Sequence, residues 1–196
     1  MDRLVFTSLG SITNQTHVRA QITNNLANVS TVGFKQSFAV ASQSVDVQGE
    51  GFATRTSLET VGQDVINLQP GVTNRTGRAM DIALQDSTVL GVQGNDGDTA
   101  FTRRGDLRVS PLGLIENSAG HLILGENGPI NVPPGQLVTI SPDGSVFGAL
   151  PGDPAIPPVL LGTLVLRDAS EMPLTRRADG LFEPIEEQFR GADFPT

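Results

Sequence analysis

Cysteine, tryptophan and tyrosine do not occur among the 196 residues of this chain. Without cysteine the chain has no disulfide, no thiolate ligand for a metal and no cysteine nucleophile. Nine phenylalanines supply all of its large aromatic side chains. Histidine occurs only as His17, in a helical stretch, and His121, in a β-rich region, so we expect no shared metal site.

Positive charge is scarce, because 13 lysines and arginines stand against 21 aspartates and glutamates. The formal net charge is −8. A nucleic-acid binder needs cationic surface to displace the counterions of the phosphates, and docking on anionic lipid has a similar requirement. We therefore expect no nucleic-acid partner.

Long apolar runs are missing as well. A membrane span needs about 20 consecutive apolar residues, and a cleaved secretory leader needs an apolar stretch of about 7–15 residues. Neither pattern is found. Any route outward would have to use a system that does not cleave a leader.

Sequence signatures of catalysis are also lacking. No glycine-rich loop has the spacing that cradles phosphate, and no pair of carboxylates is marked as acid and base. Residues 95–98 (Asn-Asp-Gly-Asp) lack the alternating ligands and the distal glutamate of a calcium loop, so we interpret them as a hairpin turn. Gly105 and Gly113 are also interpreted as turn residues. We expect no catalytic residue, no cofactor, no metal and no small-molecule substrate.

An apolar stripe near the N-terminus is the first positive signal. Its spacing predicts a helix over residues 3–29, with Asp2 as a plausible N-cap. Helix propensity is poor, since Gly10 alone costs about 1 kcal/mol relative to alanine. We expect the helix to form only when its stripe meets a partner, although an ordinary terminal helix packed on its own domain fits the same periodicity. The candidate subunit-packing residues are Val5, Leu9, Ile12, Val18, Ile22, Leu26 and Val29.

The rest of the chain favours β structure. Residues 1–35 are the helical segment, and residues 36–78 look like an extended, partly irregular connector with short strands at 45–48 and 52–56. Residues 79–190 contain short apolar strands between Asn-Gly and Asp-Gly pairs, which tolerate the positive φ of two-residue hairpin turns. The expected fold class is mainly β, an antiparallel β domain with an N-terminal helix. Its expected strands are 81–84, 89–92, 100–103, 107–109, 112–115, 122–124, 138–140, 146–147 and 164–166, the last forming a hairpin with 181–182.

Residues 24–35 (NNLANVSTVGFK) closely resemble the N-terminal signature of the bacterial flagellar rod and hook proteins, where this signature closes the first helix. Residues 76–84 (TGRAMDIAL), 101–105 (FTRRG) and 128–130 (GPI) resemble the β domain that these proteins share. The match covers essentially the whole chain. The family-signature residues are Asn24, Asn25, Leu26, Ala27, Asn28, Gly33 and Phe34.

The resemblance implies a structural, non-enzymatic subunit of the rod in the flagellar basal body. It implies polymerisation with itself and other rod proteins into a periplasmic, torque-transmitting shaft, after export by the flagellar type III apparatus without a cleaved signal. The opening MDRL and residues 128–133 and 141–144 look most like proximal-rod members. A distal-rod or hook-type subunit is the alternative. From the residues alone, a secreted β-rich adhesin or other binding module also stays open.

The C-terminal end departs from the family pattern. Members of the family end in a second amphipathic helix that pairs with the first one. No helical period follows Phe189, and residues 191–196 form a tail. We expect either a truncated chain or a member without this partner helix. If the chain is truncated, its stripe should be covered by neighbouring subunits or be poorly ordered.

Overall fold

The computed structural model describes residues 2–38, 42–46, 56–60, 64–152 and 156–186. Two compact units are distinguished, and they are described separately. The helical unit comprises residues 1–31 and 35–67, and the β unit comprises residues 32–34 and 68–196. This grouping differs from the segments 1–35, 36–78 and 79–190 proposed above, while the tail at 191–196 lies outside the described residues.

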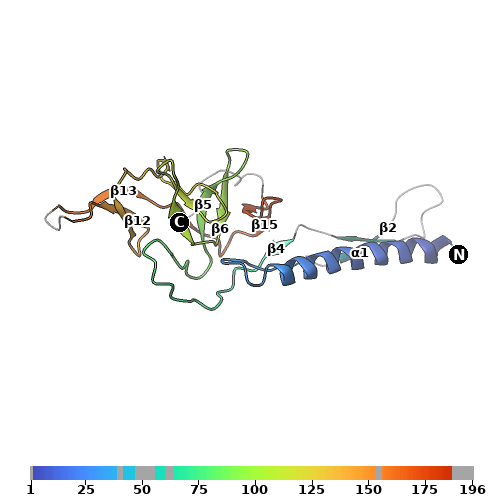
Figure 1. Ribbon diagram of the computed structural model, residues 1–196. Coiled ribbons are helices and arrows are strands. Elements are labelled where there is room, and N and C mark those ends of the chain that lie inside the picture. Colours follow the sequence, from blue (N-terminus) through green and yellow to red (C-terminus); the bar gives the residue numbers. More distant parts are fainter. Residues whose placement is uncertain (1, 39–41, 47–55, 61–63, 153–155, 187–196) are drawn as a thin grey trace. The chain divides into compact units, whose positions relative to one another are not determined.

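The helical unit consists of one long helix and short strands. Helix α1 (Asp2–Ala27) precedes β1 (Ser37–Phe38), β2 (Ser42–Asp46), β3 (Thr56–Thr60) and β4 (Val65–Ile66). Strand β1 pairs with β4, and β2 pairs with β3, both antiparallel. Strands β1 and β3 contact α1, which Figure 1 draws as a long coiled ribbon in blue. The predicted connector thus contains regular structure that packs along the helix.

Helix α1 ends two residues before the predicted boundary, within the usual spread of helix ends. The main-chain amide of Asn28 donates to the carbonyl of Asn24 at 3.1 Å, and the Asn28 side-chain amide donates to the same oxygen at 2.9 Å. The carbonyl of Asn28 then accepts from the Thr31 amide at 2.9 Å. The Asn28 side chain thus bonds a backbone carbonyl of the last turn, as polar residues at helix ends commonly do.

The β unit is built around a five-stranded antiparallel sheet in the order β14-β5-β6-β16-β15. The β5–β6 hairpin turns at Asn95–Asp98, as the Asp-Gly pair predicted. Strand bounds are β5 (Thr88–Gln93), β6 (Thr99–Thr102), β14 (Leu166–Asp168), β15 (Leu174–Arg176) and β16 (Phe182–Pro184). The predicted fold class, an antiparallel β domain with one N-terminal helix, is confirmed.

Shorter pairings complete this unit. Strand β7 (Leu107–Val109) pairs with β8 (Ile115–Asn117), and β9 (Leu124–Gly125) pairs with β10 (Gly128–Pro129). A three-stranded sheet contains β11 (Leu137–Ile140), β12 (Ser145–Ala149) and β13 (Val159–Thr163). One apolar core joins these pieces: Leu90, Val92, Ala100, Leu107, Ile115, Ile123, Ile130, Val132, Val138, Val146, Leu164 and Leu181.

Three strand predictions were wrong. Of the predicted strand 112–115, residues 112 and 113 lie in a turn and β8 begins only at Ile115. Residues 81–84 form only an isolated bridge, between Asp81 and Asp106, and the carbonyl of Leu84 accepts from the Arg103 side chain and not from a neighbouring strand. The strand before the Asp179-Gly180 turn is β15, not residues 164–166. Leu166 instead begins β14, which pairs with β5. The single buried run Leu174-Thr175 was too short to give a periodic signal.

Gly105 was wrongly interpreted as a turn residue. The described glycines with positive φ include Gly113 but not Gly105. A Cβ at Gly105 would lie 2.0 Å from the carbonyl oxygen of Ile82. The Ile82 amide also donates to the carbonyl of Gly105 at 2.9 Å. Glycine is therefore required here for close backbone approach.

The ion pair between Arg104 and Asp106, on either side of Gly105, predicts that the stability of the fold falls in acid. Arg104 Nε donates to the two carboxylate oxygens of Asp106 at 2.8 and 3.1 Å. Burial by itself raises the pKa of the Asp106 carboxyl, but the hydrogen bonds from Arg104 and its positive charge outweigh burial and lower that pKa overall. A carboxyl with a lowered folded pKa stabilises the fold above its unfolded pKa of about 3.9 and loses that contribution as pH falls through the folded value.

We therefore expect Asp106→Asn to lower the free energy of unfolding at pH 7 by about 1–2 kcal/mol. The same variant should lose less stability than the unaltered chain as pH falls from about 4 to 2. Urea unfolding at several pH values, followed by circular dichroism, measures both effects. Parallel pH profiles for the two proteins would contradict the assignment.

Candidate assembly surface and signature segments

The seven predicted packing residues form an exposed apolar ridge on and just after α1. Their exposed fractions run from 38% for Val18 to 72% for Leu26 and Val29. Val5 and Ile12 are seven residues apart, Leu26 follows fourteen later, and Ile22 and Val29 are again seven apart. Spacings of seven are typical of a helix that packs lengthwise on other helices, although Arg19 occupies the position midway between Ile12 and Leu26. We name this set of seven residues the apolar ridge.

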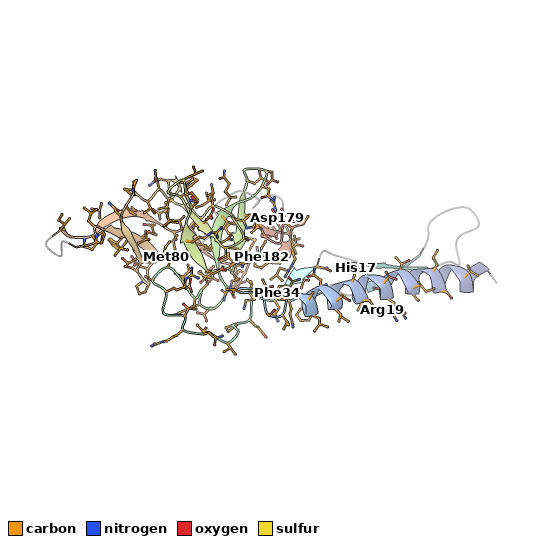
Figure 2. The ribbon with its side chains drawn as sticks, viewed as in Figure 1. His17, Arg19, Phe34, Met80, Asp179 and Phe182 are labelled. Atoms are coloured by element: carbon orange, nitrogen blue, oxygen red, sulfur yellow. The ribbon has the colours of Figure 1, made fainter. Side chains whose placement is uncertain are left out.

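The less exposed side of α1 is polar. Gly10, Asn14, Gln21, Asn25 and Asn28 are all partly buried and follow one another at helical spacing. His17 belongs to the same row, and its Nε2 lies 3.5 Å from Asp64 Oδ1 in the same unit. Figure 2 labels His17 on α1. A surface helix ordinarily buries its apolar side on its own domain, so this helix has the opposite arrangement.

Asn25 fixes the polar side of α1 to β1. Its side-chain amide donates to the carbonyl of Ser37 at 3.2 Å, and its side-chain oxygen accepts from the Ser37 amide at 3.4 Å. The Asn25 side chain therefore pairs with Ser37 as another strand would. Asn24 contributes its carbonyl to the helix end, and Ala27 is the last helical residue.

Gly33 lies in the β unit and is confined by backbone. Its φ is +69°, a region that side chains disfavour. A Cβ there would lie 2.5 Å from the carbonyl oxygen of Arg103 and 2.7 Å from Cα of Arg104. Both neighbours are main-chain atoms, so no rotamer change relieves the overlap. The glycine in the signature thus meets two independent requirements.

Phe34 stacks on an arginine of the same unit. The centre of its ring lies 4.6 Å from Cζ of Arg176, and the ring centre of Phe182 lies 5.9 Å from the same atom. Figure 2 labels both phenylalanines. Arg176 and Phe182 face each other across β15 and β16. Burial lowers the pKa of the Arg176 guanidinium, which nonetheless stays charged at neutral pH.

Arg103 ties together two of the sequence motifs. Only 8% of the residue is exposed. Its Nη1 donates to the carbonyls of Gln85, Asp86 and Thr88, and its Nη2 donates to that of Leu84 at 2.9 Å. Burial lowers the pKa of this guanidinium, an effect that the charge of Asp86 opposes. The motif at 101–105 thereby holds the loop after the motif at 76–84.

Sequence reasoning missed Arg103 and Arg176 as functional partners of the signature. Neither has a local pattern that separates it from an ordinary arginine. The useful signal for Arg103 is its place inside a motif, FTRRG, between a strand and a glycine. Arg176 gives no such signal, because its partner Phe34 is more than 140 residues away in the chain.

Within the described part of the chain, no helix is long and apolar enough to cross a bilayer. Within the same residues, no group of three or more His, Asp or Glu side chains is placed to hold a metal ion.

Comparison with known proteins gives consistent matches. Residues 83–148 match the family described as the flagellar hook protein FlgE/F/G D1 domain. The flagellar basal-body rod protein FlgF of Salmonella typhimurium is 38% identical over 93% of this chain and 71% of its own length. The chain belongs to the flagellar rod and hook protein family. Members of this family are structural subunits, and this chain is one of them.

Other relatives belong to the same family. FlgF of Escherichia coli is 37% identical over 93% of the chain and 71% of its own length. The rod protein FlgG of Buchnera aphidicola from Acyrthosiphon pisum is 33% identical over 74% of the chain and 59% of its own length. The resemblance to FlgF thus extends over more of the chain than that to this FlgG, in agreement with the proximal-rod interpretation.

Proposed function

We propose that this chain is a non-enzymatic subunit of the proximal rod of the flagellar basal body, and that its apolar ridge is buried against helices of neighbouring subunits. The observation that carries the proposal is the reversed amphipathicity of α1. Its polar side is occupied by β1 and Asp64 of the same unit, while its apolar side stays exposed.

The amount of exposed apolar surface supports assembly. Fully burying a Val, Leu or Ile side chain contributes about 1.5–3 kcal/mol. Seven such side chains, six on α1 and one just after it, exceed what an isolated soluble protein ordinarily leaves in contact with water. We expect other subunits of the same family to supply helices that match this ridge, so the chain itself and other rod proteins are its proposed partners.

The proposed location is the periplasmic rod, reached through the flagellar export apparatus without cleavage of a leader. The names of the relatives, flagellar basal-body rod proteins, support the location. The exposed ridge supports a route in which the helix is paired only after export.

Purified basal bodies test the proposal. Cells that make an epitope-tagged form of this chain are expected to contain it in the rod fraction, and cells without the gene should be non-motile. A tagged cytosolic protein is the control for contamination. Recovery of the tag only outside the basal bodies of motile cells would overturn the proposal.

A further inference from the structure

The signature residues Val32–Phe34 belong to the β unit, although residues on either side of them belong to the helical unit. The chain therefore enters the β unit for three residues, returns to the helical unit at Lys35, and leaves it again after Asn67. Such a short excursion persists only if its residues are held by specific contacts, because ordering each residue costs about 1–2 kcal/mol.

Gly33 and Phe34 make contacts of the required kind. Gly33 lies against the main chain of Arg103 and Arg104. The Arg103 side chain is itself fixed by four carbonyls, so this surface is rigid. Phe34 covers the guanidinium of Arg176, an arrangement in which the ring and the cation attract each other.

Arg176 is placed by the sheet and not by Phe34. It lies on β15 opposite Phe182 of β16, and Phe182 is buried. The ring of Phe182 lies within about 6 Å of the guanidinium, the range of an aromatic–cation contact. The receptor for Phe34 is therefore part of the folded sheet before Phe34 arrives.

We propose that Val32–Phe34 is a clasp that anchors the chain on the β unit just after α1, with Arg176 as its positioning residue. The chain passes from one unit to the other at residues 31–32, 34–35 and 67–68. The clasp fixes the first two of these connections to the β unit. Force arriving along α1 then enters the β unit through an anchored segment. This role in the rod rests on the proposed function, whereas the clasp itself does not.

Hydrogen exchange of the full chain, followed by mass spectrometry, tests the clasp. Arg176→Gln and Phe34→Leu are each expected to speed exchange at residues 33–36 about tenfold, with little change in β5 and β6. The double variant should add little to either single one, because both remove the same contact. Arg176→Lys should recover part of the protection, and Arg108→Gln, at a surface ion pair with Glu116, is the matched control.

A fluorescent variant gives a second readout. The chain has no Trp or Tyr, so Phe34→Trp introduces a single fluorophore. Its emission should be shielded from acrylamide, and Arg176→Gln in the same chain should raise quenching toward the level of Phe38→Trp, at a half-exposed position. Unchanged exchange and quenching in the Arg176 and Phe34 variants would overturn the clasp, as would an equal rise in exchange throughout the β unit.

Measurements of swimming test the role of the clasp in the rod separately from its existence. Cells that carry Arg176→Gln should incorporate the subunit and swim more slowly under viscous load. Normal swimming in a variant whose clasp is open would overturn the role in the rod. If the chain does not enter basal bodies at all, the proposed function fails while the exchange result still decides the clasp.

Discussion

Replacing Arg103 with methionine is expected to lower the free energy of unfolding of the β unit by about 3 kcal/mol or more. The guanidinium donates to the carbonyls of four residues in the loop 84–88. Methionine fills similar space but donates nothing, and a hydrogen bond from a charged group contributes about 1.5–3 kcal/mol. Asp86, whose φ is +42°, also loses the bond that holds its strained backbone.

Urea unfolding followed by circular dichroism measures this loss. Arg103→Lys keeps the charge but not the planar fork of donors, so its loss should be nearly as large. Arg108→Met is the matched control, because Arg108 forms an exposed pair with Glu116 worth at most about 1 kcal/mol. Equal unfolding midpoints for the Arg103→Met and Arg108→Met chains would show that the carbonyls find other donors.

The second large effect is expected in assembly and not in folding. Ile22→Asp places a carboxylate on the apolar ridge at a position that is 60% exposed in the single chain. Unfolding of the β unit should stay the same. In a rod the same carboxylate would be buried without a partner, which costs several kcal/mol. We expect at least about 100-fold weaker incorporation and loss of motility.

A matched control is available on the same helix. Ala20 is exposed and lies outside the ridge, so Ala20→Asp introduces the same charge, with a larger cost in helix propensity than Ile22→Asp because alanine is the best helix former. It should retain incorporation, as should the conservative Ile22→Val. If Ile22→Asp and Ala20→Asp assemble equally well, the ridge is not the packing surface.

Local signals in the sequence predicted much of this structure. The spacing from Val5 to Val29 predicted α1, and the Asp-Gly pairs at 96–97, 143–144 and 179–180 predicted turns that the structure contains. Each of these signals is contained within a few neighbouring residues. Hairpins and helices are formed by neighbours, so they can be inferred from neighbours.

Features that depend on distant residues were missed. Strand β14 pairs with β5 across more than 70 residues, and the stack of Phe34 on Arg176 spans still more. The role of Gly105 depends on the carbonyl of Ile82. None of these partners leaves a mark near the other in the sequence. Folding on assembly for residues 3–29 stays a prediction, since it concerns a monomer in dilute solution.

The polar side of α1, which Asn25 and His17 hold against the rest of the helical unit, has a consequence for when the helix should form. Most proteins become less prone to associate as they fold, because folding buries their apolar side chains. The first thirty residues differ, because helix formation brings their apolar side chains together in one strip that stays exposed to water. A folded copy therefore presents one continuous apolar strip to water, so we expect unwanted association to be least if the helix is completed only when a partner surface is present.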